Sequence, residues 1–107
     1  MSTPFDDDHM EAAEDLQEGS SEMMKYYKNW KQSIGDEAVF SDKMRELLGL
    51  AAAASTQCKF CVHSHGQKAA SHGASKKEIA QVIQIASQVR SGATMSYGLE
   101  ALEYVDE

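Results

Sequence analysis

The stretch Cys58-Lys59-Phe60-Cys61-Val62-His63-Ser64-His65 lies near the middle of this 107-residue chain and holds both of its cysteines. Two thiols three residues apart can close a small disulfide and open it again. If a helix begins at Cys58, then Cys61 and His65 follow on the same face at positions i+3 and i+7. His65 lies one helical turn after Cys61, so it can carry the proton that thiol chemistry requires. The stretch therefore predicts a helix whose first turns carry a redox site.

Two effects point to different cysteines as the activated thiol. The amino terminus of a helix stabilises negative charge, which favours a thiolate at Cys58. The histidine four residues further on favours Cys61 instead, because residues four apart are neighbours on a helix. The residues alone leave both assignments open.

A metal site is the main alternative to redox chemistry. Cys58, Cys61 and His65 could bind zinc together with His63 or Glu46, since thiolates, imidazoles and carboxylates are its usual ligands. Structural zinc sites, however, usually draw their ligand pairs from two separated segments. A buried, inert cysteine pair is a weaker alternative. We therefore expect a redox pair and no bound metal.

Glu46 is a candidate third member of the site. If the helices before and after Gln57 form an antiparallel hairpin, Glu46 lies eleven residues before the turn and His65 eight residues after it. The offset along the helix axis is about 4–5 Å at 1.5 Å per residue. Two side chains can span that distance, directly or through a water. A proton relay from Cys61 through His65 to Glu46 fits this geometry.

The segments on both sides of the turn have helical patterns. Ser41 can cap a helix that runs to about Thr56, with Asp42 at the positive end of its dipole. A second helix is expected from about Cys58 to Ser71, with Gly73 as its stop. The expected buried residues of the first of these helices are Met44, Leu47, Leu48 and Ala51 to Ala54.

The segment Ser75-Lys76-Lys77-Glu78 has the spacing of a capping box and predicts the start of another helix. Gly92 is expected to end this helix before a final one that carries Met95, Leu99 and Leu102. The residues expected to face a core are Ile79, Val82, Ile83, Ala86 and Val89.

The pattern in the first third of the chain also predicts helices, which follow an acidic start. Residues 1–10 are polar and terminal, so we expect them to be frayed. An apolar stripe at helical spacing follows, with a break or cap at Gly19-Ser20-Ser21 and a stop at Gly35. The stripe consists of Leu16, Met23, Tyr27, Trp30 and Ile34. We predict an all-α protein of about five helices, with an acidic leader at residues 1–15 and one helical domain at residues 16–107.

Charge and hydropathy exclude several classes of partner. The net charge is −7, and residues 1–22 carry eight acidic side chains and no lysine or arginine. An acidic end repels nucleic acid and anionic membranes, so neither is an expected partner. The sequence lacks both an apolar run long enough to cross a bilayer and the features of a signal peptide. We expect a cytoplasmic protein, where an adjacent cysteine pair is more often catalytic or metal-binding than a structural crosslink.

Taken together, these motifs resemble the carboxymuconolactone decarboxylase superfamily, and within it the alkylhydroperoxidase D branch. The resemblance covers about residues 40–92. It rests on the combination of three segments more than on any one of them. The segments are Lys43-x-Arg45-Glu46-Leu47-Leu48 before an alanine-rich run, Cys58-x-x-Cys61-x-x-x-His65, and Gly73-Ala74-Ser75-x-x-Glu78-Ile79.

The resemblance implies an all-α fold that assembles as homo-oligomers: dimers, trimers or hexamers built as trimers of dimers. It also implies a redox-active disulfide that reduces peroxides or protein disulfides, with an external dithiol as electron donor and no organic cofactor. Glu46 and His65 would form the proton relay, Cys61 would be the attacking thiol and Cys58 the resolving one. Phe60 stands where alkylhydroperoxidase D has a further relay histidine, which leaves disulfide reduction as an alternative to peroxide reduction. The decarboxylases that gave the superfamily its name lack the cysteine pair, so we do not expect the lactone reaction.

Overall fold

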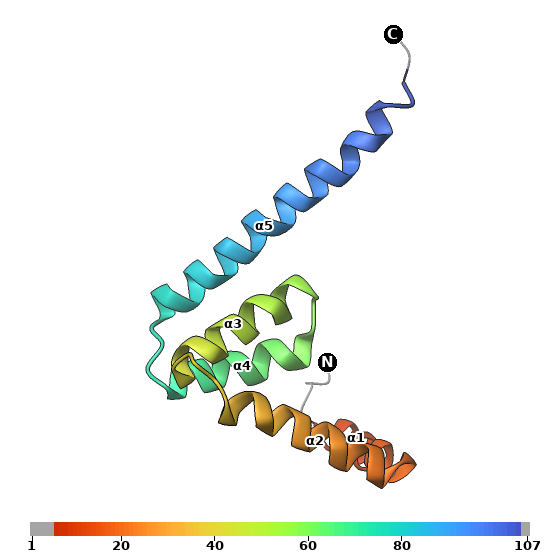
Figure 1. Cartoon of the computed structure of the whole chain (residues 1–107), viewed down its shortest axis with the longest axis vertical. Coiled ribbons are helices and arrows are strands. Elements are labelled where there is room, and N and C mark those ends of the chain that lie inside the picture. Colours follow the sequence, from red (N-terminus) through yellow and green to blue (C-terminus); the bar gives the residue numbers. More distant parts are fainter. Residues whose placement is uncertain (1–5, 106–107) are drawn as a thin grey trace. The chain divides into compact units, whose positions relative to one another are not determined.

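The computed structural model describes residues 6–105, which form five helices and no strand. This confirms the all-α prediction (Figure 1). The helices are α1 (Asp7–Gly19), α2 (Ser21–Asp36), α3 (Asp42–Ser55), α4 (Lys59–Ser71) and α5 (Lys76–Leu102). Within residues 6–105 there is no helix of the length and apolarity that a membrane span requires.

The chain divides into two compact units, Met1–Val39 and Phe40–Glu107. The first contains α1 and α2, and the second contains α3, α4 and α5. The cysteine stretch and Glu46 both belong to the second unit. The division into a leader at residues 1–15 and a domain at residues 16–107 stays a prediction, and its boundary falls within α1.

Helix α1 begins earlier than the acidic composition suggested. Part of the segment expected to be frayed, residues 1–5, lies outside the described residues. The expectation is wrong for Asp7 to Met10, which are helical. The Asp6 carboxylate accepts a hydrogen bond from the His9 N–H at 2.9 Å, and the acidic first turn suits the positive end of the helix dipole. The same acidic residues that suggested disorder therefore cap and stabilise a helix.

The break predicted at Gly19-Ser20-Ser21 separates α1 from α2. Ser20 caps α2, and its hydroxyl accepts a hydrogen bond from the Met23 N–H at 3.3 Å. The predicted stop at Gly35 is accurate to one residue, since α2 ends at Asp36. The aromatic rings of Tyr27 and Trp30 lie with their centroids 6.1 Å apart on this helix.

Helix α3 packs against both α4 and α5 and forms the centre of the second unit (Figure 1). Ser41 caps it as predicted, accepting a hydrogen bond from the Met44 N–H at 3.1 Å. Leu47, Leu50 and Ala53 recur every three residues and are buried. Three of the residues expected in the core are instead exposed in the single chain: Met44 and Leu48, at 42% and 49%, and Ala52.

Helix α5 is continuous, so the predicted break at Gly92 is wrong. A glycine inside a helix costs only about 1 kcal/mol relative to alanine, which one long helix of good helix formers can absorb. The N-terminal region therefore forms two helices, α1 and α2, separated at Ser20. The C-terminal region forms one helix, α5, where two were expected.

The start of α5 is fixed to α3. Ser75 and Glu78 form the predicted capping box: each side chain accepts a hydrogen bond from the other residue's backbone N–H. The second Glu78 carboxylate oxygen lies 3.0 Å from the Lys43 ammonium nitrogen on α3. Of the residues expected to face the core, Ala86 is buried and Ile79 and Val82 are half-buried, whereas Ile83 and Val89 are exposed in the single chain.

Candidate functional site

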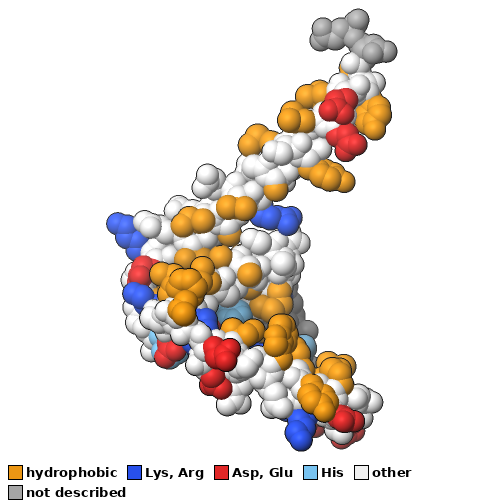
Figure 2. Space-filling view, in the orientation of Figure 1, with side chains coloured by type: hydrophobic (Ala, Val, Ile, Leu, Met, Phe, Trp, Pro, Cys, Tyr) orange, Lys and Arg blue, Asp and Glu red, His pale blue; other side chains and the backbone are white. Residues whose placement is uncertain are grey.

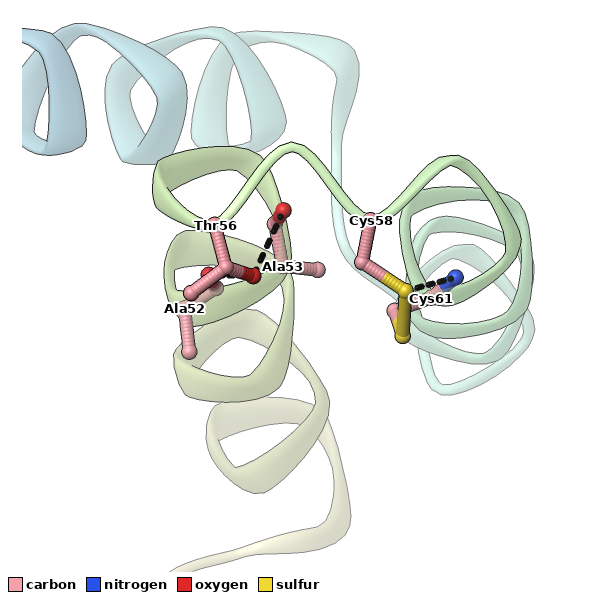
Figure 3. Close-up of a disulfide and its surroundings, with 5 residues drawn as sticks. All are labelled: Ala52, Ala53, Thr56, Cys58 and Cys61. Atoms are coloured by element: carbon pink, nitrogen blue, oxygen red, sulfur yellow. Dashed lines mark hydrogen bonds between the residues drawn. A yellow bond between two sulfur atoms is a disulfide. The ribbon is translucent and has the colours of Figure 1, made fainter.

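A three-residue turn connects α3 to α4 and brings the two helices side by side. The Cys58 N–H donates to the Ala53 carbonyl at 2.9 Å, and Gln57 has a positive φ of 57°. This is the arrangement in which a helix ends on a residue of left-handed conformation. The Thr56 hydroxyl donates to the carbonyl oxygens of Ala52 and Ala53 at 3.0 and 3.3 Å (Figure 3). The end of α3 thus places Cys58 at the start of the next helix.

Cys58 caps α4 with its sulfur. Its Sγ accepts a hydrogen bond from the Cys61 N–H at 3.2 Å, in the way a serine oxygen would at this position. The same Sγ is bonded to that of Cys61, forming a disulfide in the first turn of the helix (Figure 3). Both cysteines are half-buried. Helix α4 begins at Lys59, one residue after the predicted start.

Glu46 and His65 are in direct contact across the hairpin. Nδ1 of His65 lies 2.7 Å from Oε2 of Glu46. The two side chains therefore bond directly, without the bridging water that the sequence analysis also allowed. The Glu46 side chain is only 11% exposed, and that of His65 is 36% exposed. An ionised Glu46 can only accept, so Nδ1 of His65 carries the hydrogen of this bond. The basic position of the neutral ring is then Nε2.

Gly49 on α3 lies against the same imidazole ring. A β-carbon at this position would lie 2.7 Å from Nδ1 of His65, 2.8 Å from Cε1 and 3.0 Å from Cγ. Such distances are shorter than van der Waals contact, so the ring occupies space that any other residue type would fill. The sequence did not indicate this role of Gly49, because the ring that fills the space comes from another helix.

The arrangement combines a two-electron thiol couple with a proton acceptor. Cys61 and His65 are four residues apart on α4, and Glu46 holds the imidazole from α3. A carboxylate that accepts from one ring nitrogen raises the basicity of the other and stabilises the imidazolium form. The predicted grouping of Glu46 with His65 is thus found, while the catalytic roles of these residues and of the cysteines stay predictions.

The geometry of the same residues bears on the zinc alternative. Within residues 6–105, no group of three or more histidine, cysteine, aspartate and glutamate side chains is placed to hold a metal ion. His63, proposed as a fourth ligand, is exposed. The paired Cys58 and Cys61 sulfurs are engaged with each other in the disulfide.

Comparisons with known proteins agree with this fold. A protein of Paracoccus denitrificans described as "Uncharacterized protein 4 in cox locus" is 32% identical over 74 residues, which are 64% of this chain and 67% of that protein. A crystal structure of a protein from Methanobacterium thermoautotrophicum superposes with a TM-score of 0.76 at 21% identity, covering 80% of this chain and 97% of that one. This second likeness shows a shared fold. The family model of the carboxymuconolactone decarboxylase family matches residues 21–104, and the chain belongs to that family.

Proposed function

We propose that this protein is a thiol-dependent oxidoreductase of the alkylhydroperoxidase D type, which reduces peroxides or disulfides through Cys58 and Cys61. The observation that carries the proposal is a disulfide in the first turn of α4, with its second cysteine one helical turn before His65, whose ring Glu46 binds from α3. The cysteine pair supplies a two-electron couple, and the Glu46–His65 pair supplies a proton acceptor. Membership in a family named for an enzyme supports the assignment of an enzyme.

The cycle begins with the reduced pair. His65 accepts the Cys61 proton at Nε2 while Glu46 stabilises the resulting imidazolium. The thiolate attacks one peroxide oxygen, the O–O bond breaks, and the alkoxide takes a proton and leaves as the alcohol. Cys61 is now a sulfenic acid. The Cys58 thiol attacks its sulfur, the disulfide forms and water leaves.

An external dithiol completes the cycle by reducing the Cys58–Cys61 disulfide with two electrons and two protons. A disulfide substrate would follow the same route. Cys61 would form a mixed disulfide, and Cys58 would displace the second substrate thiol. Such a donor is kept reduced in the cytoplasm, which is therefore the compartment that we propose.

Peroxide consumption with dithiothreitol as donor tests the proposal. The assay compares the wild-type protein with Cys61→Ser, His65→Ala and Glu46→Gln. We expect Cys61→Ser to abolish turnover, and the two relay variants to slow it by about 10²-fold, the lower range for general acid–base catalysis. Equal rates in all four proteins would contradict the proposal.

The choice between peroxide and disulfide depends on Phe60. This half-buried residue lies directly before Cys61, where the alkylhydroperoxidase D branch carries a further relay histidine. A parallel assay with a disulfide-bonded peptide separates the two substrates. Phe60→His should raise peroxide turnover relative to peptide turnover if the missing imidazole limits the peroxide reaction. An unchanged ratio would assign the substrate preference to other residues.

A homo-oligomer is the second part of the proposal. From residue 87 to its end, α5 has no buried or half-buried residue in the single chain, although apolar side chains continue along it (Figure 2). Val89, Met95, Leu99 and Leu102 are each 59–69% exposed. Apolar surface of this extent favours burial against another chain, and a small domain gains most from it. The family resemblance suggests a further copy of this chain as that partner.

Sedimentation equilibrium tests the assembly directly. The wild-type protein should sediment as a dimer, trimer or hexamer, and Met95→Glu combined with Leu99→Glu should lower the mass because charged side chains resist burial. A monomeric wild-type protein would contradict this part of the proposal and leave the thiol chemistry untouched.

A further inference from the structure

We infer that Gly49 is a positioning residue of the proposed thiol reaction: its missing side chain provides the space in which Glu46 holds the His65 ring. This inference rests on the proposed function and adds a residue that positions its proton relay. Glu46 and Gly49 are three residues apart on α3, so they lie on the same face of the helix. The His65 ring from α4 contacts both of them.

The contacts define how the ring lies. Nδ1 is the atom that Glu46 binds, at 2.7 Å. The ring atoms nearest to the vacant β-carbon position on Gly49 are Nδ1, Cε1 and Cγ, at 2.7, 2.8 and 3.0 Å. The Nδ1 edge of the ring is therefore held against α3 by a hydrogen bond and by close packing. Nε2 is the ring nitrogen left to exchange a proton with a thiol or with water.

A single methyl group at residue 49 would disturb this arrangement. Heavy atoms without a hydrogen bond between them do not approach to 2.7 Å, so either the ring or the helices must move in Gly49→Ala. The ring is the end of a side chain with two rotatable bonds, and turning it is easier than separating two packed helices. We therefore expect the methyl group to displace Nδ1 from Oε2 of Glu46 and to leave the fold intact.

Gly66 provides a matched control. It follows His65 directly on α4. Apart from the two neighbouring residues and the helix's own backbone, a β-carbon there would meet no atom within 4 Å in the single chain. Adjacent positions on a helix do not face each other, so this methyl group would point away from the His65 ring. Glycine-to-alanine changes favour the helix at both positions, because alanine has the higher helix propensity. Gly49→Ala and Gly66→Ala thus share their backbone effect, and they differ in whether the new methyl group meets the imidazole.

The experiment measures turnover of the full-length protein with peroxide and dithiothreitol in a double-mutant cycle. We expect Gly49→Ala to slow turnover by about 10²-fold, to within threefold of the rate of His65→Ala. In the His65→Ala background the same substitution should change the rate less than twofold, because no ring remains to be displaced. Gly66→Ala should stay within twofold of the wild-type protein.

A spectroscopic measurement separates positioning from a general structural effect. The ¹⁵N shifts of the ring report the tautomer, and in the reduced wild-type protein His65 should show the Nδ1–H form that an ionised Glu46 imposes. Gly49→Ala should lose this preference while circular dichroism shows an unchanged helix content. Gly66→Ala should keep it.

Two results would overturn the inference. One is a Gly49→Ala protein with wild-type turnover and a wild-type His65 tautomer. The other is an equal loss of turnover from this substitution in the presence and absence of His65. If His65→Ala itself turns over like the wild-type protein, the proposed relay fails. The ¹⁵N spectra then decide the role of Gly49 in placing the ring, independently of activity.

Discussion

Nδ1 of His65 lies 2.7 Å from Oε2 of Glu46, although the two residues are nineteen positions apart in the sequence. The carboxylate is the inner member of the pair and the imidazole the outer one, with 11% and 36% of their side chains exposed. The His65 ring is therefore the member of the pair that solvent reaches more readily. The hairpin of α3 and α4 exists in this register because the turn at Gln57 fixes where α4 begins.

Glu46→Gln should separate the effect of the carboxylate charge on turnover from the effect of the size of the side chain. The glutamine amide has nearly the size of the carboxylate, but it can donate a hydrogen bond to Nδ1 and so favour the wrong tautomer of His65. We expect turnover to fall by about 10²-fold or more while the fold is kept, as seen by circular dichroism. Glu46→Asp, which keeps the charge on a shorter side chain, should retain more activity than Glu46→Gln. The reverse order would show that the charge is not what matters.

Cys58→Ser should trap the reaction at its first intermediate. The serine oxygen can accept the Cys61 N–H bond that Sγ accepts in the wild-type protein, so α4 should still begin at Lys59. Without a resolving thiol, peroxide should leave Cys61 as a sulfenic acid that dimedone labels, which mass spectrometry detects. Cys61→Ser should show no such label. A sulfenic acid on Cys58 in the Cys61→Ser protein would instead identify Cys58 as the attacking thiol.

Gln57→Gly should stabilise the protein. Gln57 is exposed and has a φ of 57°, a conformation that costs about 1 kcal/mol or more for residues with a β-carbon. Helix α4 ends at Ser71, and Gly73 two residues later has a φ of 94°. We expect Gln57→Gly to raise the free energy of unfolding by about 1 kcal/mol in urea denaturation and Gly73→Ala to lower it by a similar amount. A Gln57→Gly protein that is less stable than the wild-type protein, or a Gly73→Ala protein that is more stable, would contradict the assignment of these turns.

Glu78→Gln should lower stability in a pH-dependent way. The backbone N–H of Ser75 and then the Lys43 ammonium hold the pKa of Glu78 below its ordinary value of 4.5. A lowered pKa in the folded state adds stability above the unfolded pKa, and this stability is lost as the pH falls through the folded value. The difference in melting temperature between the wild-type protein and Glu78→Gln should therefore be largest near neutral pH and shrink below about pH 4.5. A difference that stays constant from pH 7 to pH 3 would exclude a role for the charge.

The sequence was most informative where one local interaction determines the structure. Ser41 and the Ser75–Glu78 capping box each satisfy backbone groups within four residues, and both helix starts lie where the pattern placed them. The stop at Gly73 is of the same kind, because its φ of 94° is one that glycine adopts at little cost.

The prediction was poorer where the structure depends on residues distant in the sequence or on the propensity of a whole helix. Gly92 was expected to end a helix, but the summed propensity of 27 residues outweighs one glycine. The role of Gly49 follows from a ring on another helix, which no pattern within α3 contains. Glu46 could be placed near His65 because the hairpin turn is only three residues long, so the error in register is small.

The disulfide encloses a very small ring, since it joins residues only three positions apart. Closing so short a loop removes little freedom from the unfolded chain, which limits its entropic stabilisation to about 2 kcal/mol. The packing of α3 against α4 and α5 holds the second unit together along the length of these helices, whereas the disulfide joins only two residues at the start of α4. If the pair cycles as proposed, the bond can therefore open and close with little effect on the free energy of unfolding, so that one fold would serve both oxidation states.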